Sequence, residues 1–301
     1  MLRATSMLIL LTAIWGLTFS ATKTALAVTD PLHFLALRFG LASILLTPFI
    51  FHHYHHHHHR HSFYLQSLSV GVLLFVSYVF QTVGLGMTTA SRSAFLTGLL
   101  VIIVPLLVLL FRTSRAGWGT YAAAPVSLFG VWLLAEPQSG GLNKGDVLSI
   151  LCAFAFALQM IALEWMLKTP KSRFQIHNST LLLVYIQIVV VALGAAVWSF
   201  IAGRPLRIAP EGLAGLGYNV VFGALMAVYL QTRYQPLVPA GHAALVFSLE
   251  PVFAALFAAL IMGDRWTPRG FAGAGVILTA MALASLSSKD EISRKDAKAL
   301  N

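Results

Sequence analysis

Ten apolar stretches follow one another along this chain, each close to the ~20 residues that a helix needs to cross a bilayer. Short connections separate them, so the helices they form must pack as one unit. This feature predicts an all-α integral membrane protein with ten transmembrane helices. The predicted spans are Thr5–Ala25, Leu32–Phe51, Leu65–Gly84, Ala90–Phe111, Gly117–Ala135, Val147–Leu167, Leu181–Ile201, Leu213–Tyr234, Gly241–Met262 and Phe271–Ser287.

Composition excludes a water-soluble protein. Hydrophobic residues make up 58% of the chain and charged residues 10%, whereas soluble domains have roughly 45–50% and about 25%. The net charge of +10 lies mostly between the apolar stretches, where Lys and Arg orient spans rather than bind nucleic acid. Cys152 is the only cysteine, which excludes an intrachain disulfide and a cysteine metal cluster. No P-loop motif occurs, so this chain is not an ATP-driven pump of that type.

The polar connection Pro137–Asn143 divides the spans into two sets of five. Because five is odd, the second set enters the membrane from the opposite side, and homologous sets would form an inverted repeat. Trp15-Gly16 in the first set corresponds to Phe156-Ala157 in the second. We expect one repeat over residues 1–138, a second over 139–288 and a cytoplasmic tail over 289–301. Lys and Arg are more numerous on the side that holds both termini, which predicts cytoplasmic termini.

Proline interrupts one apolar span in each half. Pro105 follows Val104, and Pro251 follows Glu250. Proline lacks an N–H group and frees a backbone carbonyl, and paired interrupted spans indicate the binding site of a transporter. We therefore expect helix breaks at Pro105 and Pro251, which meet at mid-membrane and enclose a wettable chamber.

Three charged residues are candidates for charge handling or proton transfer. Glu250 lies mid-span, where an acid costs roughly 2.5–3.5 kcal/mol on insertion scales. It is either a proton carrier or counter-charge, or a structural acid that braces the break at Pro251. Lys23 is near the end of its span and could reach the interface. Arg38 lies deep enough to need an acid such as Glu250 or a bound anion.

Aromatic and amide side chains at helical spacing form the candidate binding surface. Trp15, Phe19 and Lys23 recur every four residues and share one stripe. Such stripes more often pack against neighbouring helices than bind a ligand, so both interpretations stay open. The candidate substrate-binding residues are Trp15, Phe19, Tyr78, Gln81, Gln159, Asn219 and Tyr229.

A histidine-rich connection fills residues 52–61. Such a tract can bind divalent metal, but it has no carboxylate partner. We interpret it as a solvated cytoplasmic loop that gains positive charge below about pH 6.5. We expect no metal site and no cofactor.

Several motifs together resemble a known family. Trp15-Gly16-x-x-Phe19-x-x-x-Lys23, followed by Pro31 and Arg38, resembles the opening of the EamA-type branch of the drug/metabolite transporter superfamily. The resemblance continues in the segments Thr89–Gly98, Ser248–Leu256, Gly263–Arg265 and Gly273–Leu278. It implies ten helices as two inverted five-helix repeats around a central cavity. Asp264 departs from the family's usual glutamate, and Phe111-Arg112-Thr113 stands where a glycine-acid-arginine turn is common.

The resemblance implies a secondary transporter that exports amino acids, drugs or other amphipathic metabolites across the bacterial inner membrane by alternating access. Its partners would be a small-molecule substrate, the lipid bilayer and, if Glu250 carries one, a proton; the chain would act as a monomer or homodimer. An uncoupled facilitator or an organic-anion exchanger using Lys23 and Arg38 is the alternative. An intramembrane enzyme is disfavoured, because neither His-Glu-x-x-His nor Gly-x-Ser-x-Gly occurs.

Overall fold

The computed structural model describes residues 2–54, 61–112, 118–135, 141–166, 170–203, 210–262 and 267–299. All regular structure in these ranges is helical, which confirms the predicted all-α fold. The elements are α1 (Leu2–Leu26), α2 (Pro31–Tyr54), α3 (His61–Met87), α4 (Ala90–Gly98), α5 (Leu100–Phe111), α6 (Trp118–Ala135), α7 (Lys144–Met166), α8 (Pro170–Ile201), α9 (Pro210–Tyr218), η1 (Asn219–Met226), α10 (Ala227–Tyr234), η2 (Gln235–Leu237), α11 (Ala240–Phe247), α12 (Glu250–Met262) and α13 (Pro268–Ala299).

Each predicted span falls on one helix or on helices joined end to end. The fourth span is α4 with α5, the eighth is α9, η1 and α10, and the ninth is α11 with α12. Among the described ranges, nine helical segments are long and apolar enough to cross a membrane, and Pro268–Ala284 is a shorter apolar helix. The chain is therefore a multi-pass membrane protein.

Two spans are interrupted at matching positions, and a predicted proline lies within three residues of only one interruption. In the ninth span α11 ends at Phe247, and Pro251 is the second residue of α12. In the fourth span the interruption is at Leu99, and α5 continues through Pro105. The break predicted at Pro105 is therefore wrong. A proline removes only one helix hydrogen bond, which membrane helices tolerate, whereas Gly98 directly before Leu99 is a poor helix former.

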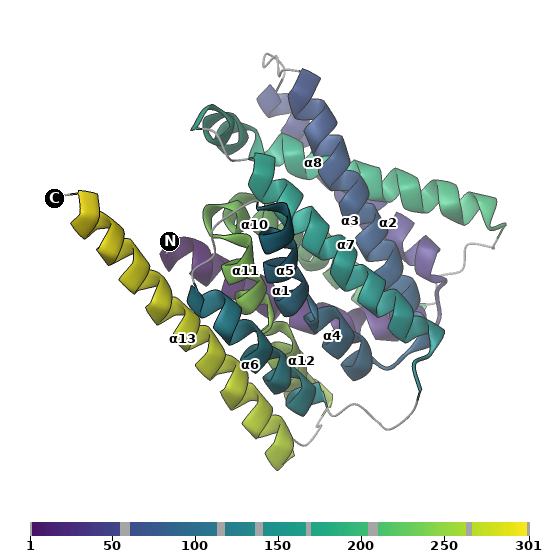
Figure 1. Cartoon of the computed structure of the whole chain (residues 1–301). Helices are drawn as coiled ribbons and strands as arrows, with labels where there is room; N and C mark the ends of the chain where they lie inside the picture. Colours follow the sequence, from purple (N-terminus) through teal and green to yellow (C-terminus); the bar gives the residue numbers. More distant parts are fainter. Residues whose placement is uncertain are drawn as a thin grey trace.

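The two halves of the chain interleave. The most extensive packing pairs α6 with α13, α3 with α7 and α2 with α8, and each pair joins one helix from either half. In Figure 1, α13 runs along α6 at one edge of the molecule, and α3 lies beside α7. The halves therefore share one core. The repeat boundaries near residue 138 and the inverted relation between the halves stay predictions.

Glycine permits the close crossing of α6 and α13. A Cβ atom on Gly130 would lie 2.8 Å from the carbonyl oxygen of Gly273, and one on Gly273 would lie 2.6 Å from the carbonyl oxygen of Gly130. Both distances are shorter than van der Waals contact. Small residues thus let these two backbones touch, as is common where membrane helices associate.

Some sequence predictions fall outside the described residues. These are most of the histidine-rich connection, the Gly263–Arg265 turn and much of the connection between the halves. The tail predicted to start at residue 289 is described, and its backbone continues α13 as far as Ala299.

Candidate functional site

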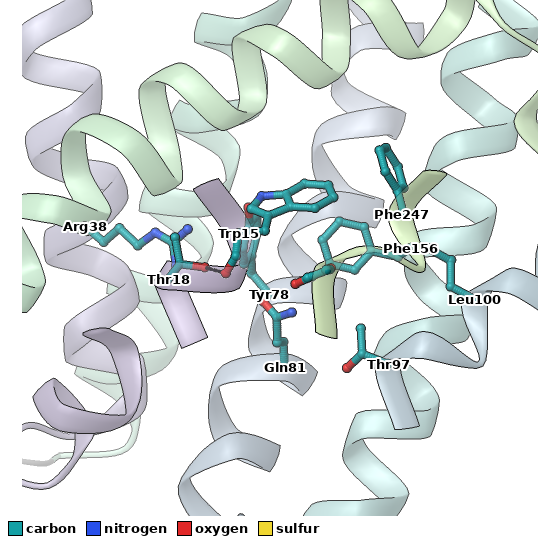
Figure 2. A pocket seen from close by; sticks show the side chains of 10 residues that line it. Trp15, Thr18, Arg38, Tyr78, Gln81, Thr97, Leu100, Phe156 and Phe247 are labelled. Atoms are coloured by element: carbon teal, nitrogen blue, oxygen red, sulfur yellow. Dashed lines mark hydrogen bonds between the residues drawn. The ribbon is translucent and has the colours of Figure 1, made fainter. Parts of the chain in front are cut away.

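An open space of about 400 Å³, part of it continuous with solvent, lies between the two halves. Six spans contribute its lining, because α1, α2 and α3 from the first half meet α7 and the two broken spans, α4 with α5 and α11 with α12 (Figure 2). The lining residues are Trp15, Thr18, Arg38, Tyr78, Gln81, Thr97, Leu100, Phe156, Phe247 and Glu250.

Four aromatic rings form an apolar wall of this cavity. The ring of Trp15 lies edge-on to that of Phe247, at 5.0 Å between centroids, and to that of Phe156, at 6.1 Å. Phe156 in turn lies edge-on to Tyr78, at 5.6 Å. Edge-to-face contacts of this kind add to the free energy of apolar burial. The wall is therefore a preorganised surface for an apolar or aromatic group.

Arg38 supplies a buried positive charge at the cavity. Its side chain, 3% exposed, donates from Nη2 to the carbonyl oxygen of Gly223 at 2.7 Å. Its guanidinium carbon lies 4.9 Å from the ring centroid of Tyr78 and 5.1 Å from that of Phe39, both within cation–π range. None of the acidic side chains in the described ranges forms an ion pair with Arg38.

The π-helix η1 presents the carbonyl that Arg38 contacts. Such wide turns are rare and often occur at functional sites. Asn219, the first residue of η1, accepts a bond from Thr22 at 3.2 Å and donates to the carbonyl of Gly215 at 2.9 Å. Gly223 leaves room for the guanidinium, since a Cβ atom there would lie 2.7 Å from Arg38 Nη2.

Glu250 supplies a carboxyl group to the same cavity. It is the first residue of α12, directly after the interruption, and its side chain is partly exposed. A carboxylate is favoured at a helix N-terminus. Tyr78 lines the same cavity as Glu250. The interruption therefore places an acid against the chamber.

A second cavity of about 240 Å³ adjoins the first. Thr18, Arg38 and Gln81 line both, so Arg38 lies where they meet. The second cavity is more polar along its walls, and it extends toward the C-terminal ends of α1 and α3. Its remaining lining residues are Phe19, Thr22, Thr82 and Leu85.

Lys23 lies beyond the second cavity, near the C-terminal ends of α1 and α3. Its Nζ donates to the carbonyl oxygens of Leu85 at 2.7 Å and Thr88 at 2.8 Å, where α3 ends. The Thr88 hydroxyl donates to Asp146 Oδ1 at 2.8 Å, and Arg92 Nη2 lies 2.8 Å from Asp146 Oδ2. Asp146 is fully buried at the start of α7. We call these four side chains the Lys23 closure.

Glu164 forms a corresponding contact near the other end of α7. Its Oε2 accepts a bond from the backbone N–H of Ala240, the first residue of α11, at 3.0 Å. Gln235 donates to the carbonyl of Met160 at 3.4 Å on the same side. We call Glu164 and Gln235, with these two backbone groups, the Glu164 closure.

The structure brings five of the predicted site residues to the main cavity: Trp15, Arg38, Tyr78, Gln81 and Glu250. Phe19 lines the second cavity, and Lys23 lines neither.

Three predicted binding residues lie elsewhere. Gln159 accepts a bond from Gln231 at 2.9 Å and donates to Gln187 at 3.4 Å in a buried network. Asn219 links η1 to α1 through its hydrogen bond with Thr22. Tyr229 packs against the largest hydrophobic cluster of the protein. Their helical stripes predicted inward-facing side chains but could not distinguish a cavity from contacts between helices.

Five lining residues were not predicted: Thr18, Thr97, Leu100, Phe156 and Phe247. The sequence correspondence between Trp15 and Phe156 could have indicated Phe156. Leu100 directly follows the first interruption, so the correct position of that interruption would have indicated it. Phe247 directly precedes the second interruption.

The profile of the EamA-like transporter family matches this chain twice, over residues 2–135 and 143–286. An uncharacterized transporter of Archaeoglobus fulgidus is 26% identical over 93% of this chain and 84% of its own length. An S-adenosylmethionine uptake transporter of Rickettsia felis is 24% identical over 86% of this chain and 84% of its own length. A crystal structure at 14% identity, covering 96% of this chain and 97% of the other, has the same fold with a TM-score of 0.74.

Proposed function

Because this chain belongs to the EamA-like transporter family, we propose that it is a secondary transporter exporting small amphipathic metabolites across the bacterial inner membrane by alternating access. The observation that carries the proposal is the central cavity, whose lining comes from both halves and includes an aromatic wall, a buried cation and an acid. A substrate with an apolar body and a polar end would find both kinds of surface there.

Closures on both sides of the cavity support the alternating mechanism. Asp146 and Glu164 lie 18 positions apart on α7, and a rise of 1.5 Å per residue separates them by about 27 Å. We propose that the Lys23 closure and the Glu164 closure open one at a time as the two halves rock. Both termini would face the cytoplasm in this arrangement.

Glu250 is the proposed site of proton coupling. An acid in the cavity wall can take up a proton from one side and release it to the other as access alternates. Glu250→Gln preserves the shape of the side chain but cannot carry a proton. In proteoliposomes we expect this variant to lose the dependence of flux on an imposed pH gradient, while counterflow without a gradient persists.

Glu211→Gln is the matched control, because Glu211 is exposed at the start of α9, away from the cavity lining. It should keep the gradient dependence. Gradient-driven flux that is unchanged in Glu250→Gln would remove proton coupling through this residue. Absence of substrate-dependent flux from a panel of amino acids, organic acids and cationic drugs would remove the transport proposal.

The Rickettsia felis relative favours a second candidate, since its name specifies uptake rather than export. The fold permits either direction, and the driving gradient decides it. Flux measured in vesicles of both orientations separates the two: export requires net movement from the face that bears the termini. An uncoupled facilitator or exchanger would show counterflow with no response to a proton gradient.

A further inference from the structure

Arg38 has more hydrogen-bonding capacity than the protein uses. A guanidinium carries five N–H donors, and the structure assigns the Nη2 group to the carbonyl of Gly223. Nε is buried and has no partner. A buried donor without a partner costs free energy, and more so when it is charged. The side chain is therefore poised for an acceptor that the protein itself does not provide.

The charge of Arg38 is likewise left for a ligand to balance. The rings of Tyr78 and Phe39 stabilise the cation in part. Glu250 lines the same cavity but forms no ion pair with Arg38, nor does any other acid in the described ranges. Lys23 lines neither cavity, because carbonyl oxygens of α3 and its following turn hold its ammonium group. Arg38 is thus the one Lys or Arg that the linings of the two cavities include.

Arg38 also lies where a ligand would pass. It lines both cavities, together with the hydroxyl of Thr18 and the amide of Gln81. Figure 2 shows Arg38 and Thr18 on one side of the chamber and Phe247 and Leu100 on the other. A molecule with its charged end at Arg38 would extend its apolar body toward the aromatic wall.

We propose that the transported substrate carries a carboxylate that binds Arg38 in the central cavity, with its apolar part against Trp15, Phe156 and Phe247. Two N–H groups of a guanidinium match the two oxygens of a carboxylate. A single lining cation suits one negative charge better than a phosphate dianion. This inference rests on the proposed transport function and identifies the chemical class of its substrate.

If Arg38 had a purely structural role, its charge would not affect which ligands the protein binds. One N–H to Gly223 is enough to support η1, and Arg38→Lys could retain one such donor. In that case the protein would not distinguish an acid from its uncharged amide. The two accounts therefore separate on a matched pair of ligands, even before any substitution is made.

The test is equilibrium binding of radiolabelled 3-phenylpropionate to the purified full chain, with 3-phenylpropionamide as its uncharged match. Acetate with acetamide and butyrate with butyramide serve as smaller pairs. We expect the wild type to bind the acid of at least one pair about tenfold or more tightly than the amide. Arg38→Gln should weaken acid binding about 30-fold, since it removes one partner of a buried charged pair. It should leave amide binding within about threefold.

Two further variants test separately the charged and the apolar part of the proposed site. Arg38→Lys keeps the charge but not the paired donors, so it should retain part of the preference for the acid. Phe247→Leu, which trims the aromatic wall, should weaken the acid and the amide of the phenyl pair by the same factor. If Arg38→Gln does not fold, the wild-type comparison of acid with amide decides alone.

Equal binding of acid and amide by the wild type, or an acid preference that survives in Arg38→Gln, would overturn the proposal. Transport of uncharged or cationic compounds by a protein that binds none of the three acids would also overturn it. In that case the proposed transport function would still hold. A protein that transports no compound of the flux panel and binds no acid would contradict both the proposed transport function and the proposed carboxylate site.

Discussion

Lys23 in the first half and Glu164 in the second make similar contacts with backbone groups but carry opposite charges. Trp15 precedes Lys23 by eight residues, and Phe156 precedes Glu164 by eight. Each charged side chain lies near the C-terminal end of its helix and contacts backbone at a turn between two helices. The helix that follows that turn begins at Ala90 in one case and at Ala240 in the other.

The difference in charge follows from which helix end is contacted. Lys23 contacts carbonyl oxygens where α3 ends, and free carbonyls at a helix C-terminus attract a cation. Glu164 contacts an N–H where α11 begins, and free N–H groups at a helix N-terminus attract an anion. The two halves thus keep a common geometry while each closure has its own chemistry. Under the proposed mechanism, this difference would allow each side to be opened separately.

The largest effect is expected at Asp146. Its fully buried carboxylate accepts from Thr88, from Arg92 and from the backbone N–H of Asn143. Asp146→Ala removes all three acceptor contacts and leaves Arg92 without its counter-charge. We expect the free energy of unfolding in mixed micelles to fall by about 3 kcal/mol. Glu211→Ala, at an exposed position, should change it by less than ~0.5 kcal/mol, and equal effects of the two would contradict this account of the Lys23 closure.

Lys23→Met and Glu164→Gln should open opposite ends of the protein. Each removes one charge that contacts backbone, and we expect a loss of stability of about 1–2 kcal/mol for each. In a Cys152→Ala background, Leu85→Cys reports on the Lys23 closure and Met160→Cys on the Glu164 closure, since both native side chains are buried. Lys23→Met should speed labelling of the first reporter by a water-soluble thiol reagent, and Glu164→Gln that of the second.

The control in this experiment combines each substitution with the reporter at the opposite end of the protein. Lys23→Met should leave the Met160→Cys reporter no more reactive than before, and Glu164→Gln should do the same for Leu85→Cys. If either substitution exposes both reporters, the closures do not act separately.

The smallest expected effect is at Thr88, whose hydroxyl donates one bond to Asp146. Thr88→Val keeps the shape of the side chain, and its backbone carbonyl can still accept from Lys23. We expect a loss of about 1 kcal/mol in the free energy of unfolding, with labelling of Leu85→Cys nearly unchanged. A loss as large as that of Asp146→Ala would show that the hydroxyl, rather than the Arg92 pair, holds this end together.

Sequence reasoning was most successful where a pattern extends over many residues. Runs of about 20 apolar residues place the spans because lipid leaves few other solutions. The mid-span acid at Glu250 likewise indicated the chamber wall, because an acid at that depth needs a polar surrounding.

Short-range rules were less successful. Proline suggested the break at Pro105, but the helix is interrupted at Leu99. Helical spacing could not tell that Gln159 lies in an amide network while Phe156, three residues earlier, lines the cavity. The buried role of Asp146 depends on Thr88 and Arg92, which are distant in sequence. Contacts of this kind follow from how the halves interleave, which local spacing does not specify.

The most direct test of alternating access to one central cavity uses Leu100→Cys, again without Cys152, because Leu100 lines the chamber. Labelling by an impermeant thiol reagent is measured from each side of oriented vesicles. We predict that Lys23→Met directs labelling to the side where α7 begins, that Glu164→Gln directs it to the opposite side, and that a transported substrate slows both. Labelling from the same side in both variants, or from both sides at once in the wild type, would contradict the account.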